Sequence, residues 1–167
     1  DRVFTSFFPA SVAPARCETA VIDRSGLSRQ RAYELQTLVT EAPIRLSEAL
    51  PDPTDDQGEE FIELWNSGDQ TVSLAGWQLD DDLAGGGQPY SLSALTIAAH
   101  EYRAWPLSLT KLGLNNSGDQ LVLTNPLGAS VDQTVIPAAK EGQAWARRDS
   151  TWEWTTAPSP SAPNEFP

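Results

Sequence analysis

The chain has 167 residues, a hydrophobic content of 40% and six tryptophans, which is enough for one domain with its own core plus some additional material. A single cysteine, Cys17, excludes an internal disulfide. The net charge of −12 belongs to residues 44–167, because residues 1–43 carry five arginines and five acidic residues. Such a field repels phosphate, so we expect this region to bind no nucleic acid directly and to favour basic partners or cations.

The composition also bears on where the protein works. The chain has no methionine, begins at Asp1, and is poor in lysine but rich in Asp, Thr, Ser and Pro. We therefore expect a processed mature chain or an excised fragment that is secreted or displayed at the cell surface. No apolar run approaches the roughly 18 residues of a membrane span.

Residues 1–43 are predicted to form an N-terminal extension with one short helix at about 27–39. Ser25 or Ser28 can cap this helix, and its apolar residues approximate one stripe. Pro43 ends it. The residues of the stripe are Leu27, Ala32, Leu35, Leu38 and Val39.

From Ile44 onward, short strand-like runs of four to eight residues alternate with turn clusters such as PDPTDDQG and AGGGQP. This spacing, without intervening helices, indicates an all-β domain over residues 44–158, either an antiparallel sandwich or a barrel. Residues 159–167 form a proline-rich tail that we expect to lie along the surface. The residues expected in the core are Ile62, Leu64, Leu74, Trp77, Leu79, Leu121, Leu123, Val131 and Val135.

The pentapeptide NSGDQ occurs twice, at Asn66–Gln70 and Asn116–Gln120. Asn, Asp and Gly between apolar runs are turn residues, so we interpret the two copies as similar turns. A divergent duplication and a pair of ligand-binding loops are the alternatives.

Several longer motifs follow one another in order between residues 44 and 164. In this order they resemble a lamin tail domain of the bacterial, secreted type, over about 120 of the 167 residues. Ser161 stands where that family usually has glycine, and the family does not explain segment 1–43. The motifs are IRLSEALPDP at 44–53, EEFIELWN at 59–66, VSLAGWQLDD at 72–81, NSGDQLVLTNPLGASVDQTV at 116–135 and SPSAPN at 159–164.

The resemblance implies an immunoglobulin-like antiparallel β-sandwich and no catalytic residues, since the domain is a binding and structural module. Bacterial relatives of this kind accompany secreted nucleases, phosphatases and other surface proteins, which suggests targeting or adhesion. The sequence has no heptad run, so a nuclear intermediate filament is excluded for this chain.

The residues themselves also give little reason to expect an enzyme. His100 is the only histidine, and no G-x-S-x-G motif supplies a nucleophile for it. The AGGG loop has no lysine and follows three aspartates, so it would repel phosphate. A carboxylate pair such as Glu59 and Glu63 would serve glycoside hydrolysis only within a substrate cleft, which the sequence does not reveal.

Two clusters of aspartates are candidate calcium ligands, Asp80 with Asp82 and Asp55 with Asp56. Calcium prefers carboxylate and carbonyl oxygens of flexible loops, which both regions offer. Neither cluster has the D-x-D-x-D-G spacing, so solvated loop acids are the alternative.

Trp152 and Trp154 lie two residues apart and so share one face of a strand. They form a candidate platform for a glycan or a protein partner, with ordinary packing as the alternative. Segment 1–43 could lie across its own domain or add to a neighbouring subunit.

We therefore expect a non-catalytic extracellular structural or adhesive module that acts through protein binding or assembly. One alternative is a subunit of a self-assembling surface filament or layer that uses residues 1–43 as an intersubunit arm. Another is an accessory targeting domain of a secreted hydrolase. The expected partners are the chain itself or other surface proteins, with a glycan as a further option, and no cofactor other than calcium is expected.

Overall fold

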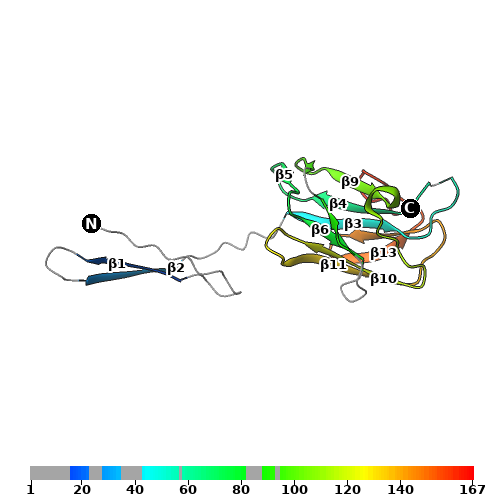
Figure 1. Ribbon diagram of the computed structural model, residues 1–167. Helices are drawn as coiled ribbons and strands as arrows, with labels where there is room; N and C mark the ends of the chain where they lie inside the picture. Colours follow the sequence, from blue (N-terminus) through cyan, green and yellow to red (C-terminus); the bar gives the residue numbers. More distant parts are fainter. Residues whose placement is uncertain (1–15, 23–27, 35–42, 57, 82–87, 93–94) are drawn as a thin grey trace. The chain divides into compact units, whose positions relative to one another are not determined.

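The computed structural model describes residues 16–22, 28–34, 43–56, 58–81, 88–92 and 95–167 (Figure 1). They belong to two compact units, Asp1–Thr40 and Glu41–Pro167, which we describe separately.

The described part of the first unit is a β-hairpin. Strand β1 (Arg16–Ile22) pairs antiparallel with strand β2 (Ser28–Glu34) along the whole length of both. The helix predicted at about 27–39 is therefore wrong for residues 28–34, and residues 35–39 lie outside the described residues. Only Ala32 of the expected stripe falls within β2. An isolated helix of three turns is marginal in water, whereas the hairpin gives the backbone of each strand a partner.

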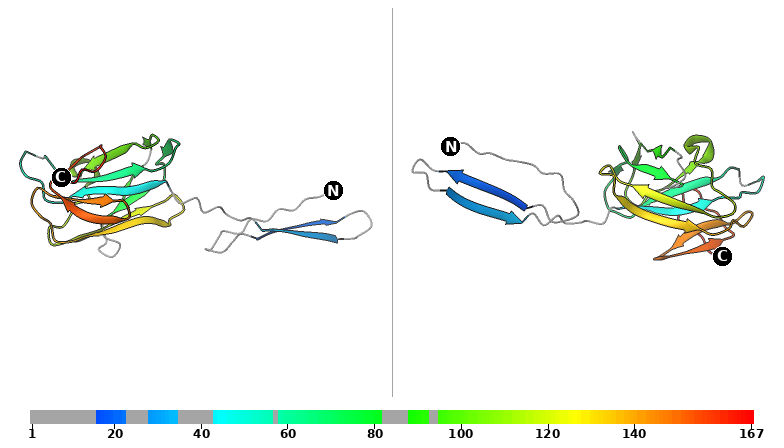
Figure 2. Two further views of the ribbon diagram at one scale, coloured as in Figure 1. Left: turned by 180° about the vertical axis from the view of Figure 1, so that it is seen from behind. Right: turned by 60° about the horizontal axis from the view of Figure 1, so that its bottom comes forward.

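The second unit is the antiparallel β-sandwich that the strand spacing predicts (Figures 1 and 2). One layer is a five-stranded sheet in the order β13-β12-β3-β4-β9, and the other is a four-stranded sheet in the order β11-β10-β6-β7. Strands β5 and β8 form a small separate sheet. Among the described residues, no helix has the length and apolar character to cross a membrane. The bounds are β3 Ile44–Leu50, β4 Phe61–Asn66, β5 Val72–Ser73, β6 Gln78–Asp80, β7 Tyr90–Ser91, β8 Thr96–Ile97, β9 Tyr102–Pro106, α1 Leu107–Thr110, β10 Asp119–Thr124, β11 Ser130–Ile136, β12 Ala144–Arg148 and β13 Thr151–Thr155.

The main core draws on both large sheets, and seven of the nine residues expected in it are buried there. Val131 packs against the core and is partly buried. The prediction is wrong for Val135, whose side chain is 68% exposed. Thr134 and Ile136 are the buried residues at that end of β11, and Val135 between them points outward because side chains alternate along a strand.

Strand β3 contains a register shift. Leu46 lies opposite Leu64 and Glu48 lies opposite Glu63, so Ser47 is an extra residue on β3. The shift turns Glu48 to the outer face of the five-stranded sheet, on the same side as Glu63. Regular alternation from Leu46 would have pointed Glu48 into the core instead.

The first NSGDQ copy is organised by a buried side chain. Asn66 ends β4 and is fully buried. Its Nδ2 lies 2.7 Å from the carbonyl oxygen of Gln70, 3.1 Å from that of Ile97 and 2.9 Å from that of Ala98. The side chain of Asn66 therefore joins its own turn to the segment after β8.

The second copy uses different groups. The carboxylate of Asp119 accepts hydrogen bonds from the backbone N–H and the Nδ2 of Asn115, at 2.8 and 3.0 Å. Gly118 has a φ of +118°, which favours glycine, whereas Gly68 is constrained by close approach, since a Cβ there would lie 2.9 Å from the Cβ of Pro43. Both copies lie at a reversal or bend between strands, as the interpretation as turns requires, but different side chains hold them in place.

Candidate functional site

A cluster of three tryptophans lies on strands β12 and β13 at one side of the sandwich. Trp145 of β12 lies opposite Trp154 of β13, with ring centroids 5.2 Å apart and planes 57° apart. Trp152 stacks on Trp145 at 6.4 Å and 15°. The structure thus places both sequence-predicted tryptophans on one face, together with Trp145, which the sequence analysis missed. All three are partly buried against the core.

Two cations lie over this cluster. The Arg147 guanidinium carbon is 4.8 Å from the ring centroid of Trp152, and the Lys140 ammonium nitrogen is 5.7 Å from that of Trp154. Both distances are typical of cation–π contacts. The rings of Trp152 and Trp154 therefore already have cationic neighbours on one side, and one of these cations, Arg147, is also paired with the carboxylate of Asp132. The role of these residues as a glycan or partner platform stays a prediction.

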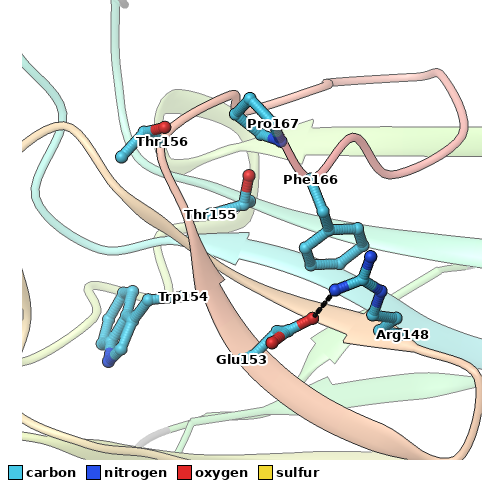
Figure 3. Close-up of a pocket in the computed structure, with 7 residues that line it drawn as sticks. All are labelled: Arg148, Glu153, Trp154, Thr155, Thr156, Phe166 and Pro167. Atoms are coloured by element: carbon cyan, nitrogen blue, oxygen red, sulfur yellow. Dashed lines mark hydrogen bonds and ion pairs between the residues drawn. The ribbon is translucent and has the colours of Figure 1, made fainter.

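A pocket of about 190 Å³ lies beside β13 (Figure 3). On one side of it, Arg148 Nη1 donates to Glu153 Oε1 at 2.8 Å, and the Arg148 guanidinium carbon lies 4.8 Å from the ring centroid of Phe166. The pocket is thus walled by an exposed ion pair and by the end of the chain. The lining residues are Arg148, Glu153, Trp154, Thr155, Thr156, Phe166 and Pro167.

The second feature of interest is a pair of buried carboxyl groups on the opposed strands β3 and β4. Glu48 is 1% exposed and Glu63 is 0% exposed. Glu48 accepts from the backbone N–H of Ser159 at 3.2 and 3.1 Å and from its hydroxyl at 3.0 Å. Glu63 Oε2 accepts from the backbone N–H of Ser161 at 2.6 Å, whereas Oε1 is buried with no hydrogen-bond partner.

Burial dominates the acid–base behaviour of this pair. It raises the pKa of Glu48 to about 7, against the opposing effect of the hydrogen bonds from Ser159. It raises the pKa of Glu63 to about 8, with the charge of Glu48 as the next cause. The pKa of Tyr102 on β9 is also raised, first by burial and then by the charge of Glu63. These glutamates favour the neutral form far more than exposed ones do.

Residues 159–164, which we name the closing segment, supply the donors to this pair. The segment is fixed at its end by Asn164, whose Nδ2 donates to the carbonyl oxygens of Ser47 and Arg147 at 3.0 and 2.8 Å. Ser161 has a φ of +61°, in the left-handed region, and its hydroxyl accepts from the N–H of Ala104 at 3.1 Å. The position where the sequence departs from the usual glycine is therefore one that favours glycine.

Three of the four aspartates predicted to bind calcium are among the described residues, and they are exposed or partly exposed. Asp80 ends β6 and is partly buried, and Asp82 lies outside the described residues. Asp55 is exposed, and Asp56 Oδ1 accepts from the Thr54 hydroxyl at 2.6 Å, which lowers the pKa of that carboxyl. Over the ranges that the structure describes, no three His, Cys, Asp or Glu residues are grouped as a metal site would require. Calcium binding stays a prediction, and a titration that follows the melting temperature tests it.

The residues considered for catalysis are not brought together, and of them only Glu63 belongs to the features above. His100 Nε2 is 3.0 Å from Asp69 Oδ1, and their side chains are 62% and 90% exposed. Glu59 is exposed and accepts from the N–H and hydroxyl of Ser108 at 2.6 and 2.8 Å, whereas Glu63 is buried opposite Glu48. The sequence signal for the burial of Glu63 is its position between Phe61 and Trp65, whose side chains lie on the same side of β4.

Taken together, the two antiparallel sheets and the strand order define an immunoglobulin-like β-sandwich module. Residues 39–137 match the family model described as Lamin Tail Domain. The match covers more than half of the chain, so the protein belongs to the lamin tail domain family, as the sequence motifs indicate. No curated protein matches the chain.

Proposed function

We propose that this protein is a non-catalytic structural or adhesive module that works outside the cytoplasm through protein binding or assembly. The supporting observation is the tryptophan cluster on β12 and β13, with Arg147 and Lys140 over its rings. Tryptophan and arginine are the residues most enriched at the energetic centres of protein interfaces. Because β13 is an outer strand of its sheet, a partner can reach the cluster from the side.

The charge of the domain favours particular partners. Residues 44–167 carry eighteen acidic and six basic residues, so the surface attracts basic proteins and repels nucleic acid. A second copy can also approach if Lys140 at the tryptophan cluster meets an acidic part of its neighbour.

Sedimentation velocity of the whole chain over a wide concentration range tests this proposal. Association that weakens in a Lys140→Glu variant supports a role for the tryptophan cluster, with Lys111→Glu as the matched control because Lys111 lies at the end of α1. If the wild-type chain stays monomeric at high concentration, assembly is contradicted. Binding of the immobilised chain to proteins or glycans, again compared with the Lys140→Glu variant, then decides whether the cluster binds anything.

The hairpin of β1 and β2 favours a second version, in which the chain is a subunit of a surface filament or layer. A two-stranded hairpin alone is marginally stable in water and gains from packing on another surface. The outer strands of a sandwich are available for such pairing. Negative-stain images of the whole chain and of residues 44–167 separate the two versions, since only the whole chain would form ordered assemblies.

A further inference from the structure

The buried carboxyl pair lies at the middle of a line of residues that crosses the whole five-stranded sheet. The pairing runs from Glu153 through Ala146, Glu48 and Glu63 to Ala104. Alanines therefore flank the two glutamates within the sheet, and the closing segment lies over them. The other charged or titratable groups that the register places on this face are Arg45 of β3, Tyr102 of β9, Arg148 of β12 and Glu153 of β13.

Two ionised carboxylates cannot both be stable in this position. At 0–1% exposure neither is hydrated, and their mutual repulsion is strong where the dielectric is low. The groups near Glu63 that lower its pKa are the polar groups of Ser161, Ser47 and Ala162, of which the Ser161 N–H forms the short hydrogen bond to Oε2, and no cation is among them. The pair therefore needs a positive charge between the two groups.

A proton meets this need better than a metal ion. Calcium would require six to eight oxygen ligands, and no group of three or more acidic or histidine residues is assembled in the part of the chain that the structure describes. A proton occupies no extra volume. Placed on Glu63 Oε1, which is buried without a hydrogen-bond partner, it would turn this atom into a donor, and the strand register places Glu48 opposite as the acceptor.

We propose that Glu48 and Glu63 share a single proton, and that this proton holds the closing segment on the outer face of the five-stranded sheet. In the protonated pair, Oε1–H of Glu63 donates to Glu48, while the remaining oxygens accept the N–H groups of Ser159 and Ser161. One negative charge is then spread over groups that are all hydrogen-bonded. This inference does not depend on the proposed binding role.

Loss of the proton to a base in solution leaves two adjacent carboxylates without water. The closing segment is the cover that can move, because the other neighbours belong to the sheet, so its displacement admits water to the pair. The move breaks the hydrogen bonds from Ser159 and Ser161. It also displaces the end of the chain that walls the pocket at Phe166 and Pro167 (Figure 3). The protein would thus be closed in acidic and neutral solution and open in alkaline solution.

A titration of the wild-type chain by NMR tests the shared proton directly. With the glutamate side-chain carbons labelled, two glutamates are expected to titrate well above the ordinary value of about 4.3, and the others close to it. Variants Glu48→Gln and Glu63→Gln assign the two signals. If every glutamate titrates near the ordinary value, the proposal is overturned, and this measurement requires no variant to fold.

Amide hydrogen exchange tests the release of the segment. The protection of the Ser159 and Ser161 amides, relative to intrinsic exchange at each pH, is expected to fall by roughly tenfold or more between neutral and alkaline solution. In Glu63→Gln the amide group donates at every pH, so protection should persist. Glu153→Gln is the matched control and should behave like the wild type. Equal loss of protection in wild type and Glu63→Gln would refute the release, and Glu48→Gln replaces Glu63→Gln if that variant does not fold.

Discussion

Arg147 and Asp132 connect the two sheets of the sandwich. Nη2 of Arg147, on β12, lies 2.9 and 2.7 Å from the two carboxylate oxygens of Asp132, on β11. Both side chains also bind the backbone of Leu46 on β3: Asp132 accepts its N–H at 2.9 Å, and Arg147 Nε donates to its carbonyl at 2.8 Å. Side-chain exposures of 18% for Arg147 and 12% for Asp132 keep water from replacing these bonds.

Because of this connection, we expect the Asp132→Ala substitution to lower the stability of the domain strongly. The substitution removes the carboxylate partner of Arg147 Nη2 and the acceptor of the Leu46 N–H, so we expect the free energy of unfolding in urea to fall by about 3 kcal/mol. Glu153→Ala is the control, because it breaks the exposed Arg148–Glu153 pair, for which a loss below about 1 kcal/mol is expected. Equal losses in the two variants would contradict the role of Asp132.

The backbone conformation at Ser161 predicts which of two variants at this position is the more stable. Ser161→Ala removes the hydrogen bond from Ala104 but keeps the positive φ, whereas Ser161→Gly removes both the bond and the steric cost of that φ. The glycine variant should be more stable than the alanine variant by about 1 kcal/mol. Thermal and urea unfolding measure the difference. The reverse order would mean that the backbone at this position is not left-handed.

The two NSGDQ copies offer a matched pair of substitutions. Asn66→Ala removes three hydrogen bonds to backbone carbonyl oxygens, one of them fully buried, and is expected to cost about 2–3 kcal/mol. Asn116→Ala changes an exposed side chain at the same place in the motif and should stay within about 0.5 kcal/mol. Unfolding in urea compares them directly, and a similar cost at both positions would show that the turns are equivalent after all.

Stability is predicted to fall as the pH rises. The folded pair retains the shared proton, and holds a second proton in acidic solution, because the pKa values of Glu48 and Glu63 are raised to about 7 and about 8 from 4.5. Below pH 4.5 both folded and unfolded chains are protonated at these groups, so their contribution to stability is complete. Between that pH and about 8 the unfolded chain gives up protons that the folded chain retains, and the contribution is lost.

We expect the free energy of unfolding to decrease by the order of 3 kcal/mol from pH 5 to pH 9. Urea unfolding followed by tryptophan fluorescence at several pH values measures this decrease. Repeating the series at high salt is the control, since salt screens repulsion between exposed charges but not between buried ones. A decrease that disappears at high salt would assign the effect to the acidic surface instead.

Local sequence patterns predicted the core and the fold correctly where one face of a strand is buried and the other is exposed. Alternation placed Ile62 and Leu64 in the core, and turn residues divided the strands correctly enough to predict a sandwich. The order of the longer motifs then indicated the lamin tail family, which the match over residues 39–137 confirms.

The sequence-based predictions were wrong or incomplete where a residue's contacts are made with residues distant in the sequence, or where the segment has little hydrophobic pattern. The segment at Ser28–Glu34 has few apolar residues of either period, and its pairing with β1 overrides the helical pattern. Buried Glu63 was not foreseen as a partner of Glu48, because the closing segment that covers both comes almost a hundred residues later, with Ser161 bonded to Glu63. The alternation of apolar and polar residues along β4 does not reveal that the closing segment also covers the outer face of this strand.

The extra residue Ser47 has a consequence for how this chain can change in length. Deleting Ser47 would restore strict alternation and still keep Leu46 opposite Leu64 and Glu48 opposite Glu63. The deletion would, however, remove the carbonyl oxygen that accepts the Nδ2 of Asn164, which is one of the two bonds that fix the end of the closing segment. The extra residue is thus dispensable for the alternation of β3 but not for anchoring the segment that covers the carboxyl pair.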